Sequence, residues 1–235
     1  MGSESGMSIT SIIRVGLLSF SVSMLYACPS TSTLKSARTL DEGKLRFAVA
    51  PEFSVFSLGG EPLKKPQIEM AARYGLTDDI EIGAKLWLPG LQADVKYALM
   101  RSEDGNSGWD LSLNPGIGYV GGISGTATGS GSELHVLTFY MPFLAGYNIG
   151  DGHQVVLGPK LINQIWMTAD ESGEVINLLY AGSSIGFVWK ASDGIRLIPE
   201  VSFGIPVLRT LTGVGTDASA SGLLLQAGLA IEFGQ

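Results

Sequence analysis

Apolar and polar residues alternate with a period of two along most of this chain, from residue 44 to residue 233. Within one stretch, for example, Ile68 and Met70 alternate with Glu69 and Arg73. Successive side chains of a β-strand point to opposite faces, so this alternation predicts strands that carry one apolar and one polar face. The pattern therefore predicts an all-β fold for most of the chain.

Turn residues divide the alternation into about ten segments, which we expect to be antiparallel neighbours in sequence order. The segments are 44–57, 67–76, 80–88, 91–99, 109–119, 135–149, 154–167, 179–190, 195–205 and 223–233. Each is close to the roughly 10 residues that a tilted membrane-spanning strand needs.

The composition of the two faces indicates which one meets lipid. One face carries Leu, Ile, Val and Phe, whereas the other mixes charged residues with many Gly, Ala and Ser. Charged residues make up only 16% of the chain and mean hydropathy is +0.27, against roughly 25% charged residues in soluble domains. Small and charged residues suit a narrow lumen, and large apolar ones suit acyl chains. A closed, up-and-down transmembrane β-barrel is favoured over the alternative, a soluble sandwich or lipocalin-like barrel.

Aromatic residues and connection lengths agree with this orientation. Aromatic side chains of apolar-face parity gather at one end of the segments, as an interfacial girdle requires: Phe47, Tyr74, Tyr97, Trp109, Tyr147, Phe187, Trp189 and Phe233. Long outer loops are expected at 58–66, 121–133, 168–174 and 208–221, and short periplasmic turns at 77–79, 150–153 and 191–194. The short connection 89–90 and the longer one at 101–108 break this rule, which leaves eight and twelve strands open as alternatives.

The N-terminus has the character of an export signal. Val15–Ala27 is an apolar run that follows Arg14 and is too short to span a bilayer as a helix. The run ends in Leu25-Tyr26-Ala27-Cys28, which resembles the lipobox of bacterial lipoproteins. That resemblance implies a signal peptide over 1–27, acylation of Cys28 and sorting to the outer membrane. The alternative is a free or buried cysteine after an ordinary signal peptide. The Ser/Thr-rich residues that follow predict a flexible tether over 28–43, ahead of a barrel over 44–235.

The chain as a whole resembles small bacterial outer-membrane β-barrels of the eight-to-twelve-strand kind. Its last strand carries Gln226, Gly228, Ile231 and Phe233 at a spacing similar to the signal read by the barrel-assembly machinery. The resemblance implies a place in the bacterial outer membrane, with membrane lipid and that machinery as partners.

Charged residues of polar-face parity are expected to line the lumen. The basic ones are Arg46, Arg73, Lys85, Lys96, Lys160, Lys190 and Arg196, and the acidic ones are Glu52, Glu69, Glu81, Asp94, Asp110, Glu200 and Glu232. The two sets balance, which predicts ion pairs that plug the lumen, because an isolated charge in a low-dielectric interior is costly. A narrow water-filled pore lined by the same charges is the alternative.

Catalytic, cofactor and metal-binding motifs are weak. The only histidines are His135, beside Ser132 and Glu133, and His153, beside Asp151, and neither arrangement forms a triad or a metal-ligand cluster. No cofactor is predicted, and a pI of about 4.8 argues against nucleic-acid binding.

Three functions remain open at this stage. The first is a structural or interaction barrel whose outer loops meet an extracellular or envelope protein. The second is a narrow small-solute channel or transport component. The third is a lipid-modifying enzyme that uses His135.

Overall fold

The computed structural model describes residues 30–57, 62–103, 105–124, 133–168, 175–212 and 222–234. The expected signal peptide, Cys28 and Ser132 lie outside the described residues. No helix among the described residues has the length and apolar character required to cross a membrane.

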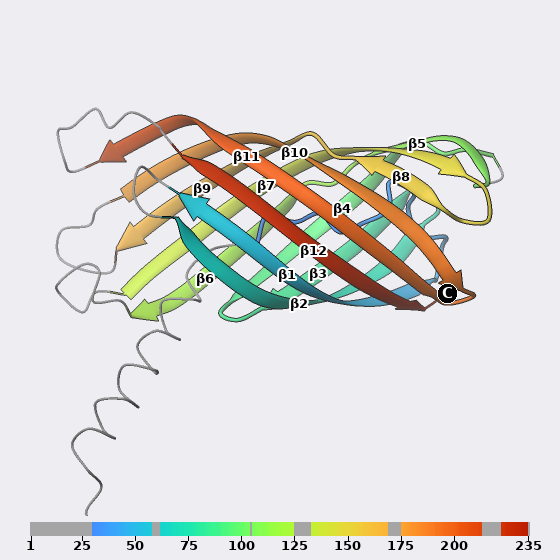
Figure 1. Ribbon diagram of the computed structural model, residues 1–235, viewed down its shortest axis with the longest axis horizontal. Helices are drawn as coiled ribbons and strands as arrows, with labels where there is room; N and C mark the ends of the chain where they lie inside the picture. The colour runs from blue at the N-terminus through green and yellow to red at the C-terminus, as the bar shows by residue number, and fades with distance from the viewer. Residues whose placement is uncertain are drawn as a thin grey trace, which may run out of the picture.

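Within these described ranges, twelve strands form one antiparallel sheet (Figure 1). They are β1 (Leu45–Ser57), β2 (Leu63–Thr77), β3 (Ile80–Trp87), β4 (Gly90–Met100), β5 (Ser107–Leu113), β6 (Gly116–Ser124), β7 (Glu133–Ile149), β8 (Gln154–Leu157), β9 (Lys160–Thr168), β10 (Val175–Ser192), β11 (Ile195–Thr212) and β12 (Leu223–Gly234).

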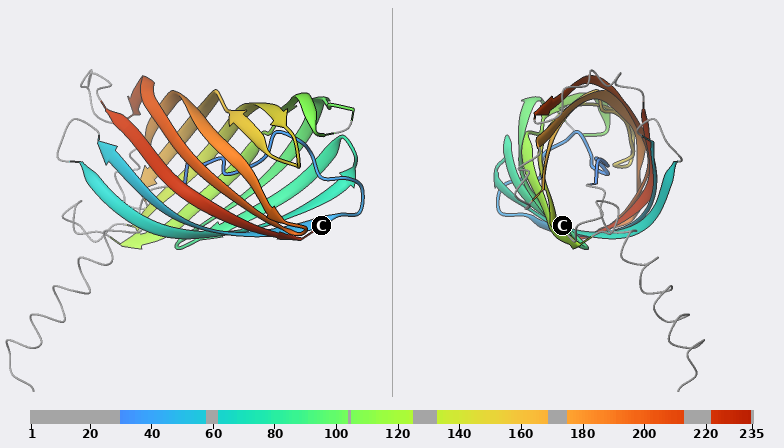
Figure 2. Two further views of the ribbon diagram at one scale, coloured as in Figure 1. Left: turned by 45° about the vertical axis from the view of Figure 1, so that its right-hand side comes forward. Right: turned by 90° about the vertical axis from the view of Figure 1, so that its left-hand side faces the viewer.

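The sheet closes into a barrel of ten strand positions. β12 pairs with both β11 and β1, and every other neighbour in the ring is hydrogen-bonded in turn. β5 and β6 lie end to end between β4 and β7, and β8 and β9 lie end to end between β7 and β10. The ten-strand, up-and-down prediction is confirmed, and the axial view shows the closed ring (Figure 2).

A proline accompanies each of the two interrupted strand positions. Asn114 and Pro115 separate β5 from β6, and Gly158 and Pro159 separate β8 from β9. Proline has no N–H to donate to a ladder, so regular pairing stops there. Backbone hydrogen bonds still cross both breaks, for example from the Phe143 N–H to the Pro159 carbonyl at 2.9 Å.

The two faces of the sheet separate as the alternation predicts. Along β4, buried and exposed residues alternate from Gly90 to Leu99. Large apolar side chains such as Ile68, Val201 and Phe203 are about half exposed or more, and all face outward. The aromatic girdle also faces outward, with Phe47 and Trp189 each more than half exposed. A belt of this kind meets hydrocarbon in a membrane barrel.

The two ends of the barrel differ in their connections. One end, which we call the turn end, carries the connections 78–79, 101–106, 150–153 and 193–194 together with the start of β1 and the end of β12. The opposite end, the loop end, carries the remaining connections. Outer-membrane barrels place short turns in the periplasm, which predicts that the turn end is the periplasmic one. The two-residue connection 88–89 at the loop end departs from this pattern.

We call residues 30–42 the lumen segment, of which residues 30–40 run inside the barrel (Figure 2). Ser30–Ala37 are all buried, as are Thr39 and Leu40. This differs from the flexible tether predicted for 28–43. A Ser/Thr-rich composition favours an exposed tether only when no polar cavity is at hand, and here the small hydroxyl side chains fit a narrow, charged interior.

Candidate functional site: the filled lumen

Most of the charged residues expected in the lumen are buried there. Of the fourteen, the buried ones are Arg46, Glu52, Glu69, Arg73, Glu81, Lys85, Asp94, Lys96, Asp110, Lys160, Glu200 and Glu232. Lys190 and Arg196 are half-buried near the turn end. Lys65, in a stretch expected to be an outer loop, also lies buried because β2 begins at Leu63.

Ion pairs connect these charges across neighbouring strands. The Arg73 guanidinium lies 3.1 Å from both the Glu81 and the Asp94 carboxylate. Glu81 also lies 2.8 Å from the Lys96 ammonium. These groups come from β2, β3 and β4, so the network holds three adjacent strands in one register. Lys85 with Glu69, at 3.1 Å, links β3 to β2 a second time, and Arg46 with Glu232, at 3.3 Å, links β1 to β12.

The lumen segment adds two cations to this interior. The Lys35 ammonium lies 2.9 Å from Asp94 and donates to the Asn114 side chain at 2.6 Å. The Arg38 guanidinium lies 3.4 Å from Asp110. The sequence analysis missed both residues because they stand in a stretch without periodicity. The only available signal was their presence among small hydroxyl residues.

Lumen carboxylates and amides accept hydrogen bonds from the backbone of the segment. The Glu200 carboxylate accepts from the backbone N–H groups of Thr33 and Leu34, at 2.8 and 2.5 Å. Glu81 accepts from the Leu40 N–H at 2.9 Å, and Gln154 accepts from the Ala37 N–H at 2.8 Å. Buried backbone groups require such partners, and this segment has no strand beside it to supply them.

Lumen lysines donate hydrogen bonds to the carbonyl groups of the same backbone. The Lys160 ammonium donates to the Thr31 carbonyl at 2.6 Å, and the Lys85 ammonium donates to the Ser32 carbonyl at 3.1 Å. Lys96 donates to the Arg38 carbonyl at 3.0 Å. The lumen charges therefore do more than neutralise one another, because they replace water around an extended peptide.

Apolar groups fill the rest of the interior. Leu34 and Ala37 of the segment pack in a buried cluster with Leu144, Val188 and Ile198. Nearer the loop end, a second cluster crosses the lumen, which we call the apolar layer: Phe56, Tyr140, Ile162, Leu178, Tyr180 and Leu224. The Tyr140 hydroxyl joins the two regions by donating to Thr33 Oγ1 at 3.1 Å.

Both histidines lie at the ends of the barrel and outside this network. His135 Nδ1 lies 2.7 Å from the Tyr119 hydroxyl near the loop end. His153, near the turn end, accepts a hydrogen bond at Nδ1 from the Lys190 backbone N–H at 3.2 Å. Within the described part of the chain, no three His, Cys, Asp or Glu residues are grouped as metal ligands.

Residues of the expected assembly signal occupy both faces of β12. Gln226 points into the lumen, accepts from the Thr31 hydroxyl at 2.6 Å and donates to Glu52. Gly228 faces the side chain of Glu52, whose Cγ would lie 2.9 Å from an added Cβ. Phe233 is 43% exposed on the outer face, and Ile231 has the same parity.

Among known proteins, similarity to this chain is found in solved structures. No protein-family model matches the sequence, and no curated protein matches it. Solved structures similar to it include Neisserial surface protein A, at 8% identity over 82% of this chain and 99% of that one, with a TM-score of 0.46. The outer membrane protease OmpT from Escherichia coli is 10% identical over 85% and 100% of the two chains, with a TM-score of 0.45. Ail of Yersinia pestis is 8% identical over 83% and 99%, with a TM-score of 0.40.

The assignment of this chain as an outer-membrane β-barrel depends on its own geometry. Its sheet is closed, its outer surface is apolar, and its interior holds the charged residues. This is the arrangement that a barrel requires in hydrocarbon, because no backbone edge and few charges are left facing the lipid.

Proposed function

We propose that the protein is a structural or interaction barrel of the outer membrane whose lumen is closed by its own N-terminal segment. The observation that carries this proposal is the capture of the backbone of residues 30–40 by lumen side chains from several strands. A conducting pore of this width needs its charged lining free to contact water and solutes. Here those charges are occupied by one another and by the segment.

The partners proposed for this barrel follow from its surfaces. The apolar belt contacts outer-membrane lipid, and the barrel-assembly machinery reads the pattern Gln226, Gly228, Ile231 and Phe233. An extracellular or envelope protein would meet the connections at the loop end, since the belt is covered by lipid. We propose no enzymatic activity and no cofactor; unchanged membrane lipid composition after His135→Ala would agree with this.

Conductance in planar bilayers tests the closed lumen. We expect the purified wild-type protein to give no current steps above leak, because the segment and the apolar layer both cross the lumen. A variant that lacks residues 30–40 and carries Tyr140→Ala should give discrete steps. The matched control carries the same deletion but keeps Tyr140. Comparison of the two variants separates the effect of the lumen segment from that of the apolar layer.

Wild-type current steps would contradict the closed barrel and favour the second candidate, a narrow small-solute channel. Heat-dependent gel mobility shows whether each variant still forms a closed barrel, so a silent but unfolded variant is recognised.

We further propose that Cys28 is acylated, on the strength of the lipobox pattern. Cys28 stands two residues before Ser30, and two residues span at most about 7 Å. Ser30 lies well inside the lumen, where its hydroxyl accepts from Lys85 at 3.1 Å. An acyl anchor in the periplasmic leaflet would therefore withdraw the start of the lumen segment. Acylation and complete filling of the lumen are alternative states of the N-terminus.

Mass spectrometry of the protein extracted from membranes tests the acylation. The expected mass is that of a chain beginning at an acylated Cys28, and Cys28→Ser should abolish the modification. Neither the acylated protein nor Cys28→Ser should conduct, because the apolar layer still crosses the lumen when the start of the segment is withdrawn. An unmodified cysteine in the wild-type protein would contradict the lipoprotein proposal and leave the closed-lumen proposal standing.

A further inference from the structure

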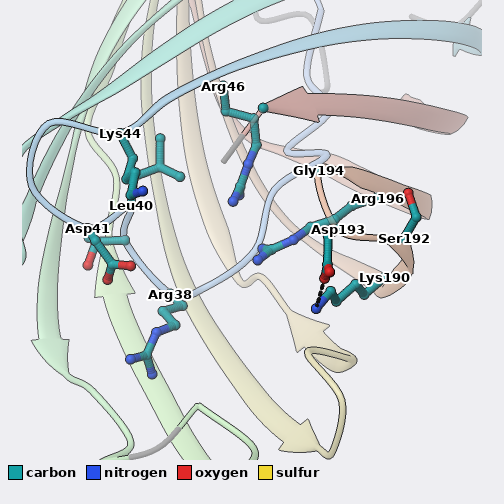
Figure 3. Close-up of a pocket in the computed structure, with 12 residues that line it drawn as sticks. Arg38, Leu40, Asp41, Lys44, Arg46, Lys190, Ser192, Asp193, Gly194 and Arg196 are labelled. Carbon is teal, nitrogen blue, oxygen red and sulfur yellow. Dashed lines mark ion pairs between the residues drawn. The ribbon is translucent and has the colours of Figure 1, made fainter.

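The turn end of the lumen contains an open polar cavity. Two adjoining volumes of about 380 and 440 Å³ share Arg38, Asp41, Lys190 and Arg196 in their linings. The lumen segment, β1 and the β10–β11 hairpin contribute to the first of them (Figure 3). Volumes of this size are within the roughly 300–1,000 Å³ range of small-molecule sites.

Positive charge predominates around the first volume. Its lining holds five basic side chains, Arg38, Lys44, Arg46, Lys190 and Arg196, and two acidic ones, Asp41 and Asp193. The whole chain carries a formal net charge of −7. An acidic protein that gathers basic residues around one cavity favours anions there over the rest of its surface.

Most of these basic groups have an acidic partner within the protein. Arg46 lies 3.3 Å from Glu232, and Arg38 lies 3.4 Å from Asp110. Lys190 lies 2.7 Å from Asp193, and this hydrogen bond and charge keep the pKa of the exposed Asp193 carboxyl below its usual value.

Besides the exposed Lys44, the exception is Arg196. It stands directly opposite Glu232 in the β11–β12 register, but Glu232 is engaged by Arg46. Among the described residues, the Arg196 side chain forms no hydrogen bond and no ion pair. Its side chain is half-buried, and a guanidinium partly removed from water without a carboxylate in contact is unfavourable. In Figure 3 the Arg46 and Arg196 side chains extend into the same space.

We propose that this cavity binds a water-soluble compound that carries a phosphate group, with Arg196 as its main ligand and Arg46 and Lys190 beside it. Guanidinium groups bind phosphate through paired N–H donors, which gives strength and orientation. The lining residues face the lumen and not the lipid belt, so a dissolved periplasmic phosphate compound reaches the site more directly than a bilayer headgroup does. The proposal is independent of whether the lumen conducts.

Titration calorimetry tests the site with inorganic phosphate and pyrophosphate as probes. The full chain is placed in nanodiscs of phosphatidylcholine, whose headgroups carry no net charge. We expect saturable binding of pyrophosphate that is tighter than that of phosphate, because pyrophosphate reaches more than one basic group. Arg196→Gln should weaken binding about tenfold or more, in line with the loss of a charge-assisted hydrogen bond.

Two further variants separate a specific site from general attraction. Lys64→Gln removes the same charge from an exposed position near the loop end and should leave binding unchanged. Arg196→Lys keeps the charge without the paired donors and should give intermediate affinity. The barrel state of each variant is checked by heat-dependent gel mobility, and Arg196→Lys serves if Arg196→Gln does not fold.

Three results would overturn the proposal. One is the absence of saturable binding by the wild-type protein. Another is equal weakening by Lys64→Gln and Arg196→Gln. The third is loss of pyrophosphate binding in phosphatidylglycerol nanodiscs, which would assign the site to a lipid headgroup.

Discussion

Single carboxylates in the lumen each bind several partners at once. Glu81 neutralises Arg73 and Lys96 and also accepts the Leu40 backbone N–H at 2.9 Å. Asp94 receives Arg73, Lys35 and the Asn114 amide, all within 3.1 Å. Because each carboxylate has several donors, its removal leaves more than one buried group without a partner.

Asp94→Asn should therefore be strongly destabilising. Breaking a buried ion pair by removing one partner costs about 3–5 kcal/mol, and here two cations lose a counter-charge. Urea unfolding of the protein in lipid vesicles, followed by tryptophan fluorescence, measures the change. The matched control is Asp41→Asn, since Asp41 is 63% exposed beside Arg101 at 2.6 Å and exposed pairs contribute about 0.2–1 kcal/mol. Equal effects of the two substitutions would contradict a tightly packed lumen.

A charge introduced on the outer face tests whether that face contacts lipid. Val201 is 53% exposed and lies six residues into β11 from the turn end, which places it near the middle of the bilayer. Val201→Arg should cost about 2–4 kcal/mol, whereas Val201→Leu should change the free energy of unfolding little. The inward neighbour Ser202 is no mild control, because it is 1% exposed and bonds Lys160. A negligible effect of Val201→Arg would show that this face meets water.

The sequence could predict which strand residues face the lumen. Alternation alone placed Arg73, Glu81 and Asp94 on the inner face, where the structure has them. It could not place Lys35 or Arg38, because a segment bound by side chains needs no periodicity of its own. Their partners lie far away in sequence, as with Arg38 and Asp110.

At the scale of elements, strand interiors were predicted better than strand ends. β2 begins at Leu63 and β11 continues to Thr212, in stretches expected to be outer loops. Apolar alternation weakens where strands leave the hydrocarbon, but backbone pairing continues there, as between Leu63 and Phe56. Polar residues at strand ends are thus indistinguishable from loop residues by pattern alone.

Two facing glycines on β10 and β11 give a prediction at this scale. Gly182 and Gly204 are cross-strand partners. A Cβ on Gly182 would lie 2.2 Å from the Phe203 carbonyl oxygen, whereas one on Gly204 would meet its nearest neighbour at an ordinary 3.9 Å. Gly182→Ala should cost about 1–3 kcal/mol through overpacking, and Gly204→Ala should be close to neutral.

The folded fraction on unheated gels and the urea midpoint measure both glycine substitutions. A neutral Gly182→Ala would show that β10 and β11 can separate there without loss of pairing.

For the whole molecule, the girdle sets the depth of the barrel in the bilayer. Trp109 and Trp189 are about half exposed on the outer face near the turn end, whereas Trp87 is 5% exposed and points inward. Indole rings prefer the headgroup level. The sequence predicted that the girdle residues lie at one end of the barrel and face outward, because both properties follow from the position of a residue within its strand.

Fluorescence quenching by brominated lipids checks this orientation. In variants that keep one tryptophan each, with phenylalanine at the other positions, Trp189 should be quenched strongly and Trp87 weakly. Bromines near the headgroups should quench Trp189 more than bromines at the acyl-chain ends. A reversed order for the two tryptophans would contradict the outward placement of the girdle.

The position of the lumen segment has a consequence for biogenesis. The segment precedes every strand in the chain, but the groups that hold it come from β3, β9, β11 and β12, among others. Those groups surround one common space only after β12 has joined β1. Residues 30–40 are therefore among the first to be synthesised and the last to reach their native environment. Until then the lumen charges stay hydrated, so closure of the barrel precedes drying of the interior.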